Sequence, residues 1–195
     1  WAVDHFIDTA RSHRRVMVLE TMGRESGDLA RMAALASGAE MVITPEGGPM
    51  TEASMRALAE KIEGAMTRGR GHAIVLIAEG VKFKPEQKRN GAYILRDAFQ
   101  EYFGRDGAPF QDLEVRPSVL GHLQRGGHTT PGDCILAARF AEEAWKTLLD
   151  PAGGNGITAL RYNKVEIVPY GCADLPERSI HSAAMDKLHD DLSSW

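Results

Sequence analysis

The hydrophobic positions of this chain follow two patterns that alternate along its length. Short runs that are apolar at almost every position are typical of strands buried on both faces of a parallel sheet, and they occur at residues 16–19, 41–44 and 73–78. Longer stretches carry apolar residues at helical spacing, at residues 2–10, 29–36, 55–66 and 93–102. A fourth strand is expected to pass through Arg116 and end near Leu120. This alternation predicts an α/β fold of three layers, α-β-α, around a mostly parallel, Rossmann-like sheet.

The last part of the chain opens with the signature of a helix start. Thr130 is a cap residue, Pro131 suits the first helical position and Asp133 suits the first turn, so we expect a helix from there to about Leu149. Two short strands, near residues 157–160 and 165–168, are expected to pair, and a polar tail with helical spacing follows at residues 180–192. We therefore predict an α/β ligand-binding domain at residues 1–149, followed by C-terminal strands and a helix at residues 150–195.

The composition excludes several classes of protein. Apolar residues make up 43% and charged residues 26% of the 195 positions, which is ordinary for a globular protein. A formal net charge of −4 argues against nonspecific binding to nucleic acid or to a membrane surface. Cys134 and Cys172 lack CxxC spacing, so the sequence indicates neither a disulfide framework nor a metal site. We expect a cytoplasmic protein, and because the chain begins at Trp1 rather than Met, a piece of a longer one.

Charged, glycine-rich turns follow the predicted strands. They occupy residues 20–24, 45–48, 79–80 and 121–125, and ligands of such sheets bind beyond the carboxyl ends of the strands. The last turn carries His122, Gln124 and Arg125 between glycines. A guanidinium fork and a histidine suit a phosphate or carboxylate, while carboxylates in the other turns suit hydroxyl groups. The turns together predict a site for an anionic polyol such as a sugar phosphate.

Each turn also has a purely structural interpretation. Arg24 could pair with Glu20 or Glu25 on an exposed loop, and Glu79 could cap the lysine-rich loop that follows it. His122 could be an ordinary hydrogen-bonded residue, and a glycine-rich turn after a strand is often a plain connection to a helix. The joint placement of these residues at strand ends favours the binding interpretation for all of them.

Four segments resemble, in order and spacing, the signatures of the 6-phosphofructokinases, a family that uses ATP or pyrophosphate. They are ETMGRESGDLA at residues 20–30, IAEG at residues 77–80, VLGHLQRGG at residues 119–127 and DCILAAR at residues 133–139. The resemblance extends from about Ser12 to Leu149 and is looser beyond. It implies that the complete protein is a glycolytic phosphotransferase, which converts fructose 6-phosphate to fructose 1,6-bisphosphate.

The resemblance also implies a role for individual residues in substrate binding. The substrate-binding set would consist of Met22, Gly23, Arg24, Glu79, His122 and Arg125. Arg24 would contact fructose 6-phosphate and stabilise charge on the transferred phosphoryl group, which makes it the candidate catalytic residue. Glu79 would bind sugar hydroxyls, and His122 and Arg125 would hold the 6-phosphate.

The resemblance also implies roles for two further sets of residues, at a subunit interface and at an effector site. Arg15 and Arg116 match arginines that reach the substrate phosphate of a neighbouring subunit, which implies a homo-oligomer; the alternatives are a helix C-terminal charge and an edge-strand surface charge. An effector site would consist of Glu40, Arg68, Arg70 and His72. Its arginines stand where relatives often have lysines, and a solvated cap at a helix C-terminus explains the basic turn equally well.

The donor side of the family pattern has no match in this sequence. The Gly-Gly-Asp-rich loop and the Thr-Ile-Asp-Asn-Asp segment, whose aspartates supply the catalytic base and the surroundings of Mg²⁺, do not occur. We interpret the chain as the C-terminal substrate-binding portion of the enzyme, inactive alone, with Mg²⁺ ligands elsewhere and the donor, ATP or pyrophosphate, undetermined. The helix at residues 128–149 is expected either to belong to or to pack on the absent donor domain. Cys134 also stands where the family often has an arginine.

Two other functions stay open at the level of the sequence. One is a non-catalytic sugar-phosphate or effector-binding regulatory module, the product of an enzyme half that kept its fold and lost its chemistry. The other is an unrelated α/β domain that binds a nucleotide near Arg125.

Overall fold

A computed structural model describes residues 1–169 of the chain. The chain divides between Arg125 and Gly126 into two compact units. The helix predicted at residues 180–192 lies outside the described residues. None of the helices in the described range is both long and apolar enough to cross a membrane.

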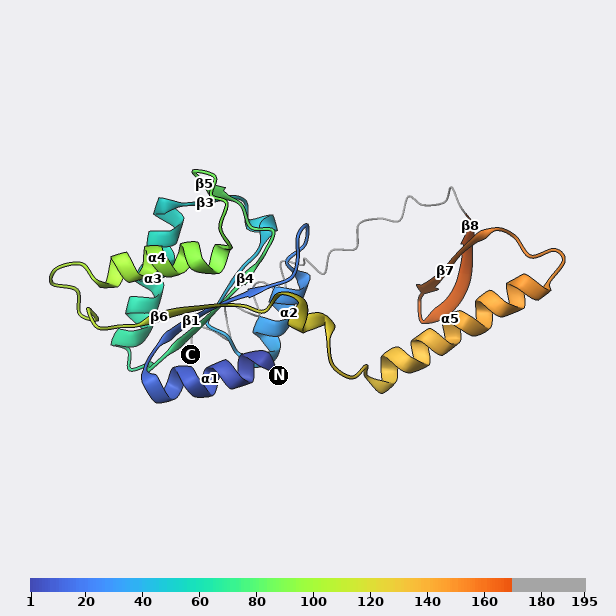
Figure 1. Ribbon diagram of the computed structural model, residues 1–195, viewed down its shortest axis with the longest axis horizontal. Helices are drawn as coiled ribbons and strands as arrows, with labels where there is room; N and C mark the ends of the chain where they lie inside the picture. Colours follow the sequence, from blue (N-terminus) through green and yellow to red (C-terminus); the bar gives the residue numbers. More distant parts are fainter. Residues whose placement is uncertain (170–195) are drawn as a thin grey trace. The chain divides into compact units, whose positions relative to one another are not determined.

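The first unit is built on a parallel sheet of four strands (Figure 1). These are β1 (Val16–Thr21), β2 (Met41–Ile43), β4 (Ala73–Ala78) and β6 (Val115–Val119), in the order β2-β4-β1-β6. Thr21 of β1 lies opposite Ala78 of β4, and Glu20 lies opposite Val119 of β6. The three neighbouring strands therefore end at one edge of the sheet, which confirms the predicted parallel arrangement.

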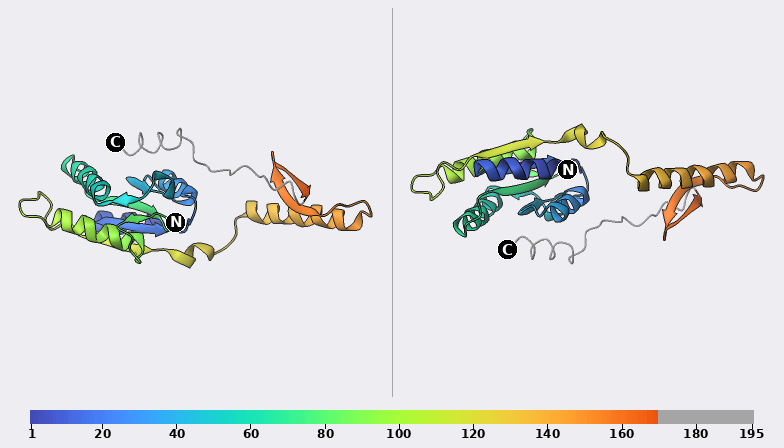
Figure 2. Two further views of the ribbon diagram at one scale, coloured as in Figure 1. Left: turned by 90° about the horizontal axis from the view of Figure 1, so that it is seen from above. Right: turned by 90° about the horizontal axis from the view of Figure 1, so that it is seen from below.

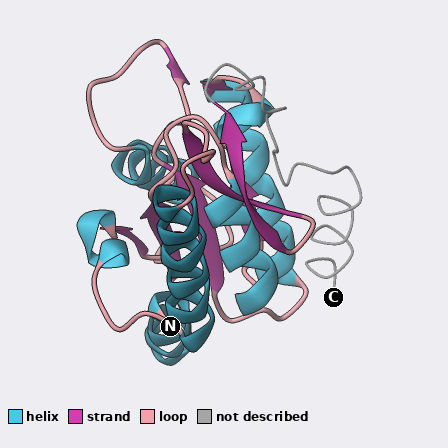
Figure 3. Cartoon of the chain, turned by 90° about the vertical axis from the view of Figure 1, so that its right-hand side faces the viewer, coloured by secondary structure: helices cyan, strands magenta, loops and turns pink. Residues whose placement is uncertain are grey.

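Helices cover both faces of this sheet (Figures 2 and 3). On one face lie α1 (Ala2–His13) and α2 (Asp28–Ser37), and on the other lie α3 (Glu52–Thr67) and α4 (Gly91–Phe103). Successive strand residues point to opposite faces, so Val16 and Val18 pack towards α3 and α4 while Met17 and Leu19 pack towards α1 and α2. The predicted α-β-α layers are confirmed.

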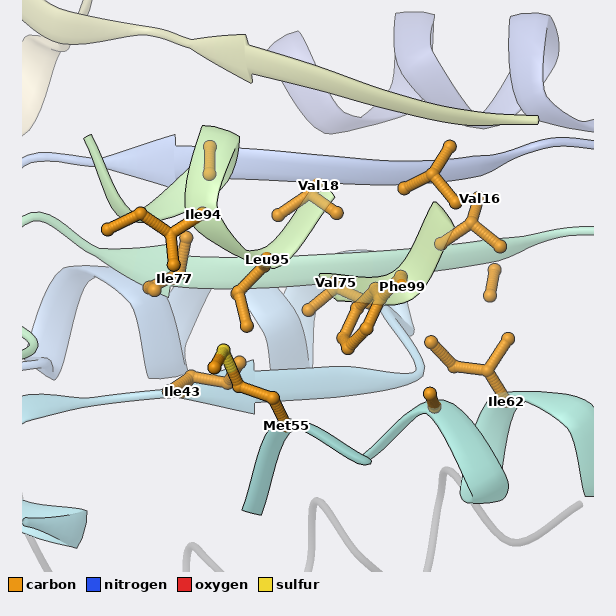
Figure 4. Close-up of a cluster of buried hydrophobic side chains, with 14 of the residues drawn as sticks. Val16, Val18, Ile43, Met55, Ile62, Val75, Ile77, Ile94, Leu95 and Phe99 are labelled. Atoms are coloured by element: carbon orange, nitrogen blue, oxygen red, sulfur yellow. The ribbon is translucent and has the colours of Figure 1, made fainter. Parts of the chain in front are cut away.

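The core between the sheet and the second helix pair contains the largest apolar side chains. Phe99 of α4 and Ile62 of α3 are at most 1% exposed and meet Val16 and Val75 of the sheet (Figure 4). Burial of a side chain of this size stabilises a fold by about 1.5–3 kcal/mol. This packing explains why the central strands are apolar at nearly every position.

Side-chain hydrogen bonds fix where α3 and α4 begin. Thr51 and Ser54 form a reciprocal capping box at the start of α3, with N···O distances of 3.2 and 2.7 Å. The start of α4 is held from the sheet, because the carboxylate of Glu20, in a residue only 2% exposed, accepts hydrogen bonds from Asn90 Nδ2 at 2.7 Å and Ala92 N at 3.0 Å. A buried carboxylate on β1 thus serves as a helix cap.

The lysine-rich segment that follows Glu79 is exposed at residues 84–90 but not throughout its length. Val81 and Phe83 are buried, and β5 (Phe83–Lys84) pairs in parallel with β3 (Met50–Thr51). Phe83 belongs to the apolar core on the side of α3 and α4. Apolar and polar residues alternate here over only four positions, 81–84, and so short an alternation does not distinguish a strand from a loop in the sequence.

The second unit consists of a helix and a hairpin. Thr130 caps α5 (Pro131–Leu149) by accepting from Asp133 N at 3.2 Å, and β7 (Gly156–Arg161) pairs antiparallel with β8 (Lys164–Pro169). Tyr162 and Asn163 form the turn with φ of 47° and 64°, as a tight two-residue hairpin requires. The predicted pairing is confirmed, and α5 contacts both strands. The functional boundary at residue 149 stays a prediction, since the compact units divide earlier.

Candidate functional site

Three turns meet where β4, β1 and β6 end. Residues 22–24 follow β1, Glu79 and Gly80 follow β4, and the 3₁₀ helix η2 (Gly121–Arg125) follows β6. Because β1 lies between β4 and β6, the turn after β1 lies between the other two. The carboxyl edge of such a sheet is where a ligand is expected.

Hydrogen bonds join the three turns. The backbone N–H of Met22 donates to Gln124 Oε1 at 2.7 Å, and the N–H of Gly23 donates to Glu79 Oε1 at 3.4 Å. In return, Gly23 O accepts from Gly80 N at 2.9 Å. The backbone that precedes Arg24 is therefore held from both neighbouring strands.

Two glycines allow this close approach of backbones. Gly23 has φ of +134°, and a Cβ there would lie 2.5 Å from Ser26 O. A Cβ on Gly80 would lie 1.9 Å from Arg24 O. Both positions exclude a larger side chain, so the path of the turn depends on them.

The charged side chains of the three turns face solvent. Arg24, Glu79, His122 and Arg125 are all exposed, which leaves two guanidinium groups, an imidazole and a carboxylate available at one edge of the sheet. The interpretation in which Arg24 pairs with Glu20 is wrong, because both carboxylate oxygens of Glu20 are engaged by Asn90 and Ala92. Chemically, the exposed set can bind an anion next to a hydroxyl-bearing group.

The far end of the Arg24 turn is anchored by Glu46, from the predicted turn at residues 45–48, and by Arg31, which the sequence analysis missed. After β2, η1 (Pro45–Gly47) carries Glu46, whose Oε1 accepts from Gly27 N at 2.9 Å and lies 3.4 Å from Arg31 Nη1. Arg31 is 5% exposed and also donates to Thr44 Oγ1 at 2.9 Å. One indication of this contact was present in the sequence: Arg31 is the only arginine in a predicted helix made mostly of small and apolar residues.

The environment of Glu46 strongly favours its charged form. Burial raises the pKa of the carboxyl, but the hydrogen bonds from Gly27 and other groups and the positive charge of Arg31 outweigh it and lower the pKa to about 2. Glu46 is therefore ionised at neutral pH and ties the start of α2 to the end of β2.

Arg15 and Arg116 lie at the opposite edge of the sheet. Both form ion pairs with Glu114. Desolvation raises the pKa of Glu114, but hydrogen bonds from Arg116 and Arg15 prevail and the pKa falls below its ordinary value. Val16, next to Arg15, lies opposite Val115, so both arginines stand near the amino ends of their strands, on the order of 15 Å from the carboxyl edge. The structure does not bring them to the Arg24 turn of the same chain.

Three of the four candidate effector residues also cluster at the amino end of β4. Glu40 forms an ion pair with Arg70 and accepts from Ile74 N at 2.5 Å. Burial lowers the pKa of His72, Glu40 opposes this effect, and the charges of Arg11 and Arg70 reinforce it. Arg68 is exposed at the C-cap of α3.

Two hollows of the described surface lie away from the strand ends. One of about 940 Å³ borders Arg96, Glu114 and Arg116, and another of about 610 Å³ lies between α3 and α4 beside Lys84 and Tyr102. Neither hollow is lined by Arg24, Glu79, His122 or Arg125. The candidate site is therefore identified by the chemistry of these four residues and by their position at the carboxyl ends of the strands. Among the described residues, no group of three or more His, Cys, Asp or Glu could hold a metal ion.

Comparisons with known proteins give a consistent result. The family model described as phosphofructokinase matches residues 1–148. The ATP-dependent 6-phosphofructokinase of Staphylococcus carnosus (strain TM300) is 39% identical over 156 residues, which cover 80% of this chain and 42% of the relative. That of Bacillus subtilis (strain 168) is 36% identical over 164 residues, 84% of this chain and 45% of the relative. The chain thus spans less than half the length of these relatives.

Solved structures share the fold. The phosphofructokinase of Saccharomyces cerevisiae matches 86% of this chain and 21% of its own, with a TM-score of 0.70 and 29% identity. The pyrophosphate-dependent phosphofructokinase of Marinobacter aquaeolei matches 75% of this chain and 36% of its own, with a TM-score of 0.59 and 22% identity. The latter likeness concerns the fold alone.

Proposed function

The chain belongs to the phosphofructokinase family, and we propose that it is the C-terminal, substrate-binding portion of a 6-phosphofructokinase. The observation that carries this proposal is the meeting of three turns at the carboxyl ends of β4, β1 and β6. The turns present Arg24, Glu79, His122 and Arg125 to solvent. The complete protein would convert fructose 6-phosphate to fructose 1,6-bisphosphate in glycolysis, in the cytoplasm.

The substrate would be bound along the edge of the sheet. His122 and Arg125, both on η2, hold the 6-phosphate through charge-assisted hydrogen bonds. Glu79 directs one carboxylate oxygen at Gly23 N, which leaves the other for sugar hydroxyls. Met22 and Gly23 supply the backbone that lies against the sugar.

Arg24 acts at the reacting end of the substrate. Phosphoryl transfer places developing negative charge on the transferred group, and fixed positive charge lowers the barrier. The exposed guanidinium of Arg24 sits on a turn whose backbone is held on both sides, as a preorganised group requires. Arg24 would therefore offset the charge on the phosphoryl group as it passes to the 1-hydroxyl.

The donor side of the reaction lies outside this chain. The catalytic aspartate and the ligands of Mg²⁺, which would neutralise donor phosphates, have no counterpart in the sequence, so the chain alone is proposed to be inactive. The names of the relatives at 36–39% identity favour ATP over pyrophosphate as donor. The helix α5 is proposed to belong to, or to pack on, that donor domain.

Neighbouring subunits would complete the site. Arg15 and Arg116 lie at the amino edge of the sheet, too far from their own Arg24 turn to share one substrate with it. In a homo-oligomer they would instead reach the substrate phosphate of a neighbouring chain. The cluster of Glu40, Arg68, Arg70 and His72 is the proposed effector site.

Calorimetric titration with fructose 6-phosphate tests the proposal. We expect binding that plain fructose does not reproduce, and Arg125→Ala and His122→Ala each to weaken it about tenfold or more, since hydrogen bonds to charged groups are lost. Arg56→Ala, which removes an exposed arginine on α3, is the matched control. Equal binding of fructose, or no effect of Arg125→Ala, would overturn the proposed site.

The alternative function is a non-catalytic sugar-phosphate or effector-binding regulatory module that uses the same strand-end residues. A full-length protein that contains this chain distinguishes the two. Formation of fructose 1,6-bisphosphate with ATP or pyrophosphate supports the enzyme. Binding without turnover supports the module, and nucleotide binding that Arg125→Ala abolishes supports a nucleotide domain.

A further inference from the structure

Gln124 connects two turns that are distant in sequence. Its Oε1 accepts the hydrogen bond from Met22 N at 2.7 Å, across 102 positions of the chain. A backbone N–H only donates, so the side-chain carbonyl oxygen, and not the NH₂ group, must face it. Gln124 itself is half-buried, whereas His122 and Arg125 on the same 3₁₀ helix are exposed.

The Met22 contact is the shortest of the bonds that hold the Arg24 turn at this end. The neighbouring bond from Gly23 N to Glu79 is 3.4 Å long, beyond the usual range for N–H···O. The bond from Gly80 N to Gly23 O, at 2.9 Å, fixes the turn to β4. Gln124 therefore supplies the main side-chain link between the Arg24 turn and the side of β6.

The base of Gln124 is itself held in place. Leu120 N donates to Glu20 O at 3.0 Å, which continues the ladder between β6 and β1, and Leu123 N donates to Leu120 O at 3.1 Å. Gly121, with φ of +48°, makes the sharp turn between the strand and η2. A side chain that starts from a fixed backbone can hold a second segment in a fixed position.

We infer that Gln124 is a positioning residue that sets the distance between the Arg24 turn and the anion-binding pair His122 and Arg125. A ligand that carries a phosphate at one end and a reacting hydroxyl at the other must contact both turns at once. Gln124 matches their separation to the length of that ligand without touching it. The inference rests on the proposed function, since it names the same sugar phosphate.

The test compares two ligands on one variant. Gln124→Leu keeps the size of the side chain and removes the acceptor, which leaves Met22 N–H without its partner. We expect affinity for fructose 6-phosphate to fall about tenfold, while affinity for inorganic phosphate, which needs only His122 and Arg125, stays within about twofold. Titrations followed by NMR of the histidine resonances measure both. Gln111→Leu, the same change at an exposed glutamine bonded to Arg105 O, is the control.

A second measurement reports on the link in the free chain. Amide hydrogen exchange at Met22 should speed up in Gln124→Leu and return to the wild-type rate in Gln124→Glu, which retains an acceptor oxygen. Exchange of the β1 amides should be the same in all three proteins.

The outcomes separate the two proposals. Wild-type binding of fructose 6-phosphate with a selective loss in Gln124→Leu supports the positioning role. Equal losses for both ligands, an unchanged affinity for fructose 6-phosphate, or no change in Met22 exchange would overturn it while the proposed function stands. A wild-type chain that binds neither ligand would overturn the proposed function, and the inference with it.

Discussion

At the scale of single residues, the candidate site depends on groups that do not themselves face a ligand. Gln124 and Glu46 hold the two ends of the turn that carries Arg24, and Gly80 leaves room for its backbone. The exposed residues of the site could be proposed from the sequence, because glycine-flanked charged turns after strands are recognisable. The supporting contacts could not, since they join residues 102 and 19 positions apart and no local pattern records such a pairing.

Glu46 should make the stability of the chain depend on pH. Its folded-state pKa of about 2 lies below its ordinary value of 4.5, so its contribution is fully present above about pH 4.5 and is lost as the pH falls from there towards 2. Glu46→Gln keeps an acceptor for Gly27 but removes the charge that faces Arg31, and should lower the free energy of unfolding at pH 7 by about 1–2 kcal/mol.

Urea unfolding at a series of pH values checks this prediction. The difference between wild type and Glu46→Gln should shrink as the solution is acidified below pH 4.5. A difference that stays constant down to pH 2.5 would show that the charge of Glu46 does not stabilise the fold. Glu60→Gln, which changes an exposed carboxylate paired with Arg56, provides the comparison.

At the scale of elements, the long apolar strands and amphipathic helices could be predicted closely. A strand such as β4 is buried at all its positions, so it appears in the sequence as an uninterrupted apolar run that has few other structural interpretations. The two-residue strands β3 and β5 could not be predicted, because an apolar/polar alternation over so few positions does not distinguish a strand from a loop. The cap of α4 could not be predicted from the sequence either, since Glu20 belongs to β1 and precedes Ala92 by 72 positions.

Removal of the Glu20 cap should destabilise α4 more than the loss of an ordinary cap destabilises α3. Glu20→Leu leaves the buried N–H of Ala92 and the amide of Asn90 without an acceptor, which should lower the free energy of unfolding by about 2–4 kcal/mol. Thr51→Ala, at the exposed start of α3, should cost about 1 kcal/mol. Chemical denaturation of both variants measures the two values, and equal losses would contradict the role given to Glu20.

At the scale of the whole molecule, the apolar core is concentrated in one unit. Apart from Val168, every buried hydrophobic residue in the described range precedes residue 116. The sequence predicted the main helices and strands of both units, but not the division at Arg125. Compactness depends on contacts between distant segments, which a linear pattern does not contain.

A chain that ends at Arg125 should therefore retain the cooperative unfolding of the first unit. It keeps all four strands of the parallel sheet and helices α1 to α4. We expect its midpoint of thermal unfolding, followed by circular dichroism, to lie within about 5 °C of that of the full chain, a shift that corresponds to about 1 kcal/mol. A broad, non-cooperative transition would show that the core needs residues after Arg125.

The edge position of β6 has a consequence for self-association. Among the described strands, β6 has a partner only in β1, so its other side presents free backbone groups that could pair with another chain and nucleate aggregates. The N–H of Leu120 points to β1. Because backbone N–H groups alternate between the two sides of a strand, the backbone nitrogen of residue 117 faces away from β1. That position is Pro117, which has no N–H to offer, and the charged Arg116 stands beside it. The open edge is thereby a poor template for an incoming strand.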